Sequence, residues 1–126
     1  ICNDWQMSLL PILLKENYKD NEFYKDTKTV FILHSINNYR YVTNQSYEYV
    51  SLNPPANKID SIEQAIKYCD YLIIVDDEKK TNQKTFKKSK KLVSASKKTK
   101  TKFLEISSSA KWSEISKKVE MILRKI

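Results

Sequence analysis

Apolar and polar positions along the chain predict strands and helices in turn. Two segments, residues 59–69 and 112–122, carry apolar residues at spacings of three, four and three, which is the period of a helix that buries one face. Two other segments, residues 29–34 and 71–75, are short continuous apolar runs rich in β-branched and aromatic residues. Such runs are typical of strands that are buried on both faces of a sheet.

The amino-terminal pattern predicts a helix over residues 4–17. Its apolar side chains form a wide face, and Asn3 or Asp4 stands where a capping side chain is expected. Pro11 lies inside this segment, so we expect a kink there, because proline cannot donate the backbone hydrogen bond of a regular helix.

Weaker patterns fill the rest of the chain. Residues 81–98 predict a lysine-dominated helix with a sparse apolar side, and residues 102–106 predict another strand. The serines at 107–109 are placed to cap the last helix. Residues 35–49 show no clear period, and the two adjacent prolines within residues 51–58 indicate a loop.

Strands that alternate with helices predict the α/β class, with an open, mostly parallel sheet flanked by helices and joined by right-handed crossovers. A chain of 126 residues suits a single domain over residues 1–126. The apolar runs are far shorter than the roughly 18 residues that a membrane-spanning helix needs, so we expect no membrane partner.

Glycine is absent from the chain. Loops that cradle phosphate groups use glycine for positive φ angles and for close approach of the backbone. We therefore expect neither a P-loop nor a glycine-rich dinucleotide fingerprint, and no cofactor. His34 is the single histidine, and Cys2 and Cys69 are too few and too far apart for a metal or disulfide framework, so we expect no metal and two free thiols.

The net charge of +8 rests on lysine, because only Arg40 and Arg124 among the 23 basic residues are arginine. Arginine supplies the forked donors that read phosphates and guanine edges, whereas lysine acts as a mobile point charge. We therefore expect no specific nucleic-acid partner. The lysine-rich surface is either a solvated face or a site of nonspecific attraction to a polyanion.

Three acids, Asp76, Asp77 and Glu78, directly follow the apolar run at residues 71–75. Such a group could hold a magnesium ion or form an acid pocket like that of a receiver domain. A receiver domain places its acids after the first strand, however, and this strand follows at least one other. We interpret the group as an acidic turn at the carboxyl end of a strand.

Three ordered blocks resemble the starch and glycogen synthases. The opening, Ile1-Cys-Asn-Asp-Trp-Gln-Met-Ser-Leu-Leu-Pro, is similar to the family segment in which an Asn- or His-Asp-Trp triplet starts a helix that ends in Leu-Pro. The block Thr29-Val-Phe-Ile-Leu-His-Ser-Ile36 stands where the family has a hydrophobic strand running into a His-Asn pair. Residues 57–75 resemble the family's Gly-Lys-Ile-Asn, helix and valine-rich strand. Together the likeness covers residues 1–42 and 57–86.

This resemblance implies a Rossmann-like half of a two-domain GT-B glycosyltransferase, located in a plastid or the cytoplasm. Such enzymes close two domains over a nucleotide-glucose donor and transfer glucose to the end of an α-1,4-glucan, so the donor, the acceptor and another polypeptide carrying the second domain are the implied partners. By resemblance Asp4 lies near the acceptor and His34 against the donor glucose, as the candidate catalytic residues. A simple helix cap and an ordinary strand-end histidine are the alternatives for these two residues.

The chain also departs from the family pattern. The family's Lys-Thr-Gly-Gly donor loop has no counterpart, Asn38-Tyr39-Arg40 replaces Tyr-Gln-Gly, and Ser61 stands where the family has Trp. Without a second domain, half of the electrostatic stabilisation of the transition state is missing. We expect a divergent fragment that is inactive as an isolated chain. The competing hypothesis is a nonenzymatic α/β interaction module that uses its lysine-rich face to bind a polyanion or a partner protein.

Overall fold

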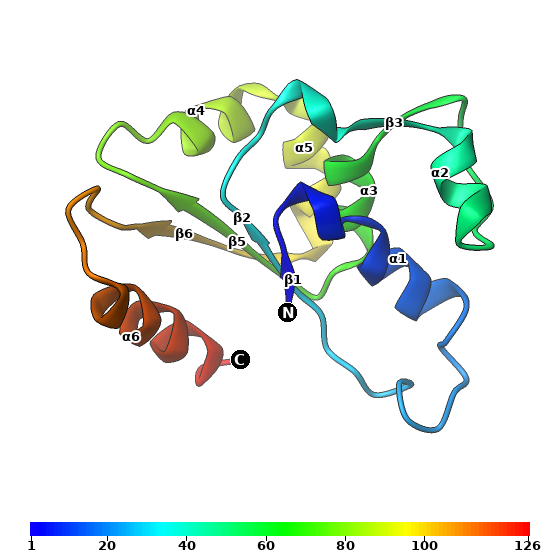
Figure 1. The fold of residues 1–126 in the computed structure, drawn as a ribbon, viewed down its shortest axis with the longest axis horizontal. Coiled ribbons are helices and arrows are strands. Elements are labelled where there is room, and N and C mark those ends of the chain that lie inside the picture. Colours follow the sequence, from blue (N-terminus) through cyan, green and yellow to red (C-terminus); the bar gives the residue numbers. More distant parts are fainter.

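The structure is a computed structural model that describes residues 1–126. Its centre is a four-stranded, all-parallel sheet in the order β1-β2-β5-β6, with a separate antiparallel pair of β3 and β4. The prediction of an α/β fold with an open, mostly parallel sheet is confirmed (Figure 1). The strands are β1 (Cys2–Asn3), β2 (Val30–Leu33), β3 (Tyr41–Thr43), β4 (Lys58–Asp60), β5 (Tyr71–Asp76) and β6 (Lys100–Glu105).

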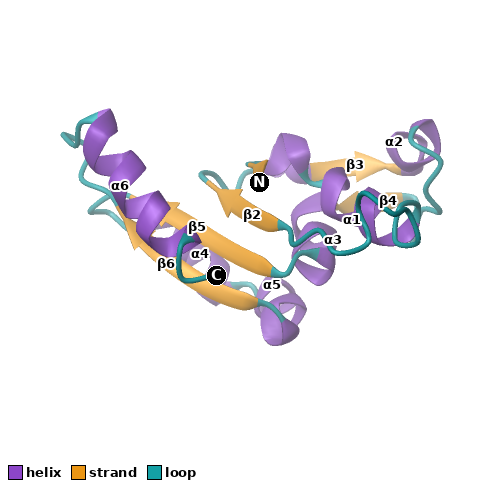
Figure 2. Cartoon of the chain, turned by 90° about the horizontal axis from the view of Figure 1, so that it is seen from below, coloured by secondary structure: helices purple, strands orange, loops and turns teal.

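Helices cover the two faces of the main sheet unequally. The strands of this sheet lie side by side in chain order, and crossovers of the same hand place their connecting helices on one face. Only α6 lies on the other face (Figure 2). The helices are α1 (Leu9–Glu16), α2 (Asn44–Tyr49), α3 (Ser61–Tyr68), α4 (Thr81–Lys88), α5 (Lys90–Ala95) and α6 (Trp112–Leu123).

The two central strands supply the middle of the core. Phe31 and Leu33 of β2, with Leu72 and Ile74 of β5, are fully buried and face α1, α3, α4 and α5. The alternate positions face α6 and pack against its half-buried residues, such as Val119 and Ile122. Because both faces of these strands are covered, their sequences are continuous apolar runs, as predicted. Both cysteines lie in this core as free thiols.

The amino-terminal helix differs from the prediction. It is split into a short 3-10 turn, Trp5–Met7, and α1, which begins at Leu9. Pro11 therefore lies in the first turn of α1, where its missing N–H breaks no helical hydrogen bond, and the expected kink inside a long helix is wrong. The expected cap is wrong as well, since the side chain of Asp4 accepts no hydrogen bond from this turn.

Two further local expectations are corrected. The segment predicted as one helix over residues 81–98 is broken at Ser89, whose hydroxyl caps α5 by accepting from the N–H of Leu92 at 3.3 Å. The serines at 107–109 do not cap α6, which begins after Lys111 without any side-chain cap. The stretch 35–49, which has no clear period in the sequence, holds β3 and α2.

A largely buried ion pair fastens the β3–β4 pair to α3. The guanidinium Nε of Arg40 lies 3.2 Å from Oδ2 of Asp60, whose other carboxylate oxygen accepts from the N–H of Glu63 at the start of α3. Arg40 also donates to the carbonyl of Asn37 at 3.1 Å, and Ser61 donates its hydroxyl to the carbonyl of Arg40. Two positions where the sequence departs from the family pattern, Arg40 and Ser61, thus contact each other.

A second polar contact joins the amino ends of β2 and β5. Oδ2 of Asp70 accepts from the N–H of Thr29 at 2.8 Å and from its hydroxyl at 3.2 Å, and it lies 3.3 Å from Nζ of Lys15. Burial alone would raise the pKa of Asp70, but the Thr29 and Lys15 contacts outweigh it, so the net pKa lies below the ordinary value.

We expect Asp70→Asn to lose stability in a pH-dependent way. Because the pKa of Asp70 is lower in the folded chain than in the unfolded chain, its carboxylate stabilises the fold at pH values above the unfolded pKa of about 4. This stabilisation disappears as the pH falls through the folded-state pKa. In urea unfolding, the variant should therefore have a lower free energy of unfolding than the parent at neutral pH, and the two free energies should converge at about pH 2. Asp20→Asn, at an exposed position, serves as the control. A difference that stays constant with pH would contradict this assignment.

Three residues, none of them glycine, adopt positive φ angles: Asp4 at 61°, Ser51 at 58° and Lys80 at 55°. Lys80 has left-handed helical geometry at the start of α4, where a Cβ costs about 1–2 kcal/mol. Its ion pair with Glu105 at 3.3 Å joins two half-exposed side chains and offsets little of that cost.

We therefore expect Lys80→Gly to raise the free energy of unfolding by about 1 kcal/mol, since glycine adopts this geometry without the steric cost. Chemical denaturation would measure the change. Lys79→Gly, one residue earlier and not at positive φ, should give no such gain. Equal effects at the two positions would show that relief of strain is not the cause.

Candidate functional site

The carboxyl ends of the four parallel strands meet at one edge of the sheet, which is where open α/β sheets bind ligands. A pocket of about 400 Å³ opens there between the ends of β2, β5 and β6 and the first turns of α4 and α6. Both apolar and polar groups line it. Those used below are His34, Asp76, Asp77, Asn82, Ser107 and Trp112.

The structure brings Asp4 and His34 together at this edge. They follow β1 and β2, which are neighbouring parallel strands. Oδ1 of Asp4 accepts from the backbone N–H groups of His34 at 3.3 Å and Ser35 at 3.2 Å, and Oδ2 accepts from the Ser35 hydroxyl at 3.1 Å. The carboxylate therefore fixes the turn that carries His34 out of β2.

Asp4 holds a strained backbone conformation. Its φ of 61° and ψ of −179° lie in a region that is essentially reserved for glycine and costs other residues about 1–3 kcal/mol. The conformation is held by the carboxylate contacts and by the N–H of Asp4, which donates to the carbonyl of Ile32 at 2.7 Å. Strain of this kind persists where the surroundings determine the conformation, often at functional sites.

The two predicted residues differ in their access to the pocket. His34 is among the residues that line it, whereas Asp4 is not, because its carboxylate is turned toward the backbone after β2. Nε2 of the His34 ring lies 2.8 Å from Oδ1 of Asn3, which fixes the orientation of the imidazole. In this arrangement His34 faces the pocket, and Asp4 holds the turn that carries His34.

Asn82 connects three elements at the same edge, and the sequence patterns did not single it out. Its Nδ2 donates to the carbonyls of His34 at 2.7 Å and Val75 at 3.0 Å, and its Oδ1 accepts from the N–H of Ile36 at 3.3 Å. The one side chain thus ties the ends of β2 and β5 to the start of α4. Its only sequence signal is an asparagine shortly after an acidic strand end.

The carboxylates of the acidic group at residues 76–78 are occupied by donors of the chain itself. Asp76 accepts from the N–H groups of Asn82 at 2.9 Å and Gln83 at 2.7 Å, which stabilises the positive end of α4. Asp77 accepts from the N–H of Lys79 at 2.9 Å. These contacts are those of an acidic turn.

Glu78 bridges the strand ends in a similar way. It accepts from the hydroxyl of Ser107 at 2.8 Å and from the N–H of Ser108 at 3.1 Å. Hydrogen bonds from its own backbone and from these serines lower the pKa of Glu78. The serines that the sequence suggested as a helix cap thus position the loop after β6.

The all-parallel sheet, its helices and the pocket at the carboxyl edge define a Rossmann-like α/β domain of the kind that forms one half of a GT-B glycosyltransferase. The model of the starch synthase catalytic domain family matches residues 1–94, so the chain belongs to that family. The match includes β1, β2 and β5, and it ends before β6 and α6.

Curated proteins that are similar to the chain include bacterial glycogen synthases. The chain is 54% identical over 35 residues to that of Chlorobium phaeobacteroides, covering 28% of this chain and 7% of that protein. It is 40% identical over 62 residues to that of Thermosipho melanesiensis, covering 48% of this chain and 13% of that protein. The matched segments are thus a small part of these relatives. No solved structure matches the chain.

We expect the carboxylate of Asp4 and the hydroxyl of Ser35 to be energetically coupled. Asp4→Asn and Ser35→Ala should each destabilise the fold, and the double variant should lose less than the sum, with a coupling energy of about 1 kcal/mol. Urea unfolding of the four proteins measures this. Asp26→Asn, at an exposed position, should show no coupling to Ser35→Ala. Additive losses for Asp4 and Ser35 would mean that the contact does not position the turn.

Proposed function

We propose that residues 1–126 form one Rossmann-like domain and that it is the amino-terminal part of a glucosyltransferase related to the starch and glycogen synthases. Its carboxyl-edge pocket would contact the glucose of a nucleotide-glucose donor and the end of an α-1,4-glucan. The observation that carries this proposal is the placement of His34 in the pocket, on a turn fixed by Asp4 in a strained conformation.

The chemistry assigned to this edge is positioning and polar contact. Asn3 sets the ring orientation of His34, and Asn82 fixes the position of its backbone carbonyl. The imidazole can therefore hydrogen-bond to a sugar hydroxyl with little loss of conformational freedom on binding. Trp112, which is 82% exposed, offers a flat apolar surface beside the polar groups of the pocket. A mostly apolar wall with a few fixed polar groups is typical of small-molecule sites.

The isolated chain would provide one wall of a cleft. Glucosyl transfer needs charge stabilisation on both the sugar and the departing diphosphate, away from water. Residues 1–126 contain no glycine for a donor loop, so the groups that hold the diphosphate would lie outside these residues. We therefore propose that the isolated chain does not extend glucans. The location in a plastid or in the cytoplasm stays a prediction from the resemblance. No helix of the structure has the length and apolar character to cross a bilayer.

The competing proposal is a lysine-rich interaction module. Part of that lysine-rich surface is already paired with a carboxylate, because Glu63 lies 3.0 Å from the ammonium of Lys67 and 3.1 Å from that of Lys91. Fewer free cations weaken attraction to a polyanion. This favours the glucan-directed proposal.

The test combines turnover and retention. With ADP-glucose and a maltooligosaccharide, the purified chain should give no chain extension, while it should be retained on amylose. His34→Ala should reduce that retention several-fold, because His34 lines the pocket, and the matched pair Lys97→Ala and Lys98→Ala should not. Clear turnover by the isolated chain would overturn the proposed inactivity. Heparin binding that survives about 0.2 M salt and is lost in the lysine variants would favour the competing proposal.

A further inference from the structure

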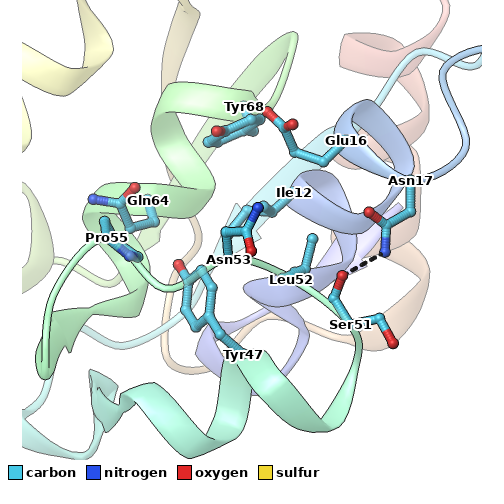
Figure 3. Close-up of a pocket in the computed structure, with 10 residues that line it drawn as sticks. All are labelled: Ile12, Glu16, Asn17, Tyr47, Ser51, Leu52, Asn53, Pro55, Gln64 and Tyr68. Atoms are coloured by element: carbon cyan, nitrogen blue, oxygen red, sulfur yellow. Dashed lines mark hydrogen bonds between the residues drawn. The ribbon is translucent and has the colours of Figure 1, made fainter.

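A second pocket lies away from the carboxyl edge, between α1, α2, α3 and the loop that follows α2 (Figure 3). Its volume is about 180 Å³. Glu16 and Asn17 come from the last turn of α1, and Tyr68 is the last residue of α3. Both helices run back from the carboxyl edge between parallel strands, so these residues lie toward the amino edge of the sheet.

The hydroxyl of Tyr47 is the feature that points to a ligand. The residue is 2% exposed, and its hydroxyl is a buried polar atom without any hydrogen-bond partner in the chain. Figure 3 shows the ring rising from α2 with this oxygen directed toward the side of Asn53 and Pro55. Leaving a buried hydroxyl unpaired costs about 1–3 kcal/mol, so such a group needs an explanation.

This hydroxyl stays a donor at neutral pH. Burial, with smaller contributions from Tyr68 and Glu63, raises the pKa of Tyr47 to about 12. Burial, with Glu16 nearby, also raises the pKa of Tyr68. Two neutral phenols and one carboxylate therefore face the same small space.

The rest of the lining disfavours anionic ligands. No lysine or arginine lines the pocket although the chain has a net charge of +8, so a phosphate or a nucleotide would find no counter-charge there. The amides of Asn53 and Gln64 and the carboxylate of Glu16 offer both donors and acceptors. Ile12 and Leu52 add an apolar surface.

We propose that this pocket binds one ring of a neutral hexose, either free or at the end of a glucan, with Tyr47 donating to a ring hydroxyl. A volume of about 180 Å³ lies below the roughly 300–1,000 Å³ of sites for drug-sized ligands and suits a single ring. Mixed donors and acceptors beside tyrosine rings and aliphatic carbons match a molecule that has hydroxyls on its rim and C–H groups on its faces. The inference depends on the chemistry of this pocket and not on the role of His34.

The decisive variant is Tyr47→Phe, because it removes only the unpartnered hydroxyl. Without ligand it should leave the fold at least as stable as the parent, since no hydrogen bond within the chain is lost. In titrations with glucose followed by the amide signals of Asn53 and Gln64 in NMR spectra, it should weaken binding roughly three- to tenfold. Tyr49→Phe, two residues along the same helix and 88% exposed, is the matched control and should bind like the parent.

Three comparisons complete the experiment. Maltotriose that binds at least as well as glucose identifies the end of a glucan as the ligand, whereas glucose alone identifies the free sugar. Glucose 6-phosphate should bind more weakly than glucose, because the pocket carries a carboxylate and no cation. His34→Ala should leave the glucose-induced shifts of Asn53 and Gln64 unchanged, which separates this site from the carboxyl-edge pocket.

Three outcomes would overturn the inference. They are the absence of saturable shifts at Asn53 and Gln64, equal glucose affinity of Tyr47→Phe and the parent, and tighter binding of glucose 6-phosphate. Shifts confined to His34 and Trp112 are a case of the first outcome and would support a sugar site at the carboxyl edge instead.

Discussion

The parallel pairing of β2 with β5 is the constraint on which the rest of the molecule depends. Residues 30–33 lie in register with residues 71–74, and their side chains form the centre of the core on both faces of the sheet. A hydrogen bond between Asp70 and Thr29 joins the two strands at their amino ends, and Asn82 binds the chain at their carboxyl ends. Every helix of the main sheet packs on one side or the other of these two strands, so their register fixes where the remaining elements can lie.

The same pairing creates the candidate site. Because adjacent parallel strands end together, residues that are far apart in the chain meet at one edge: Asp4, His34 and Asp76. Most of the acidic groups at that edge form hydrogen bonds within the chain. Asp4, Asp76 and Glu78 all accept from backbone N–H groups, and His34 is left to face the pocket. In this family member, therefore, these acids position the edge, and His34 is one of the groups that face the pocket.

The sequence predicted the elements whose patterns are set by burial, because a strand buried on both faces gives a continuous apolar run and an amphipathic helix gives a helical period. This is why β2, β5 and α6 lie where they were expected. Local polar geometry was not predictable in the same way. The positive φ of Asp4, the three contacts of Asn82 and the pairing of Arg40 with Asp60 depend on residues distant in sequence. The pocket at Tyr47 has the same origin, because α1, α2 and α3 meet only in the folded chain.

The unequal cover of the sheet has a consequence for its dynamics. One face is sealed by four helices, whereas the other rests on α6 alone, none of whose residues is fully buried. Local opening of a segment costs less free energy when it buries little apolar surface. The amides of α6 should thus exchange with solvent well before those of β2 and β5. Such transient detachment would wet the side chains of Ile32 and Ile73 and would expose an apolar surface without global unfolding.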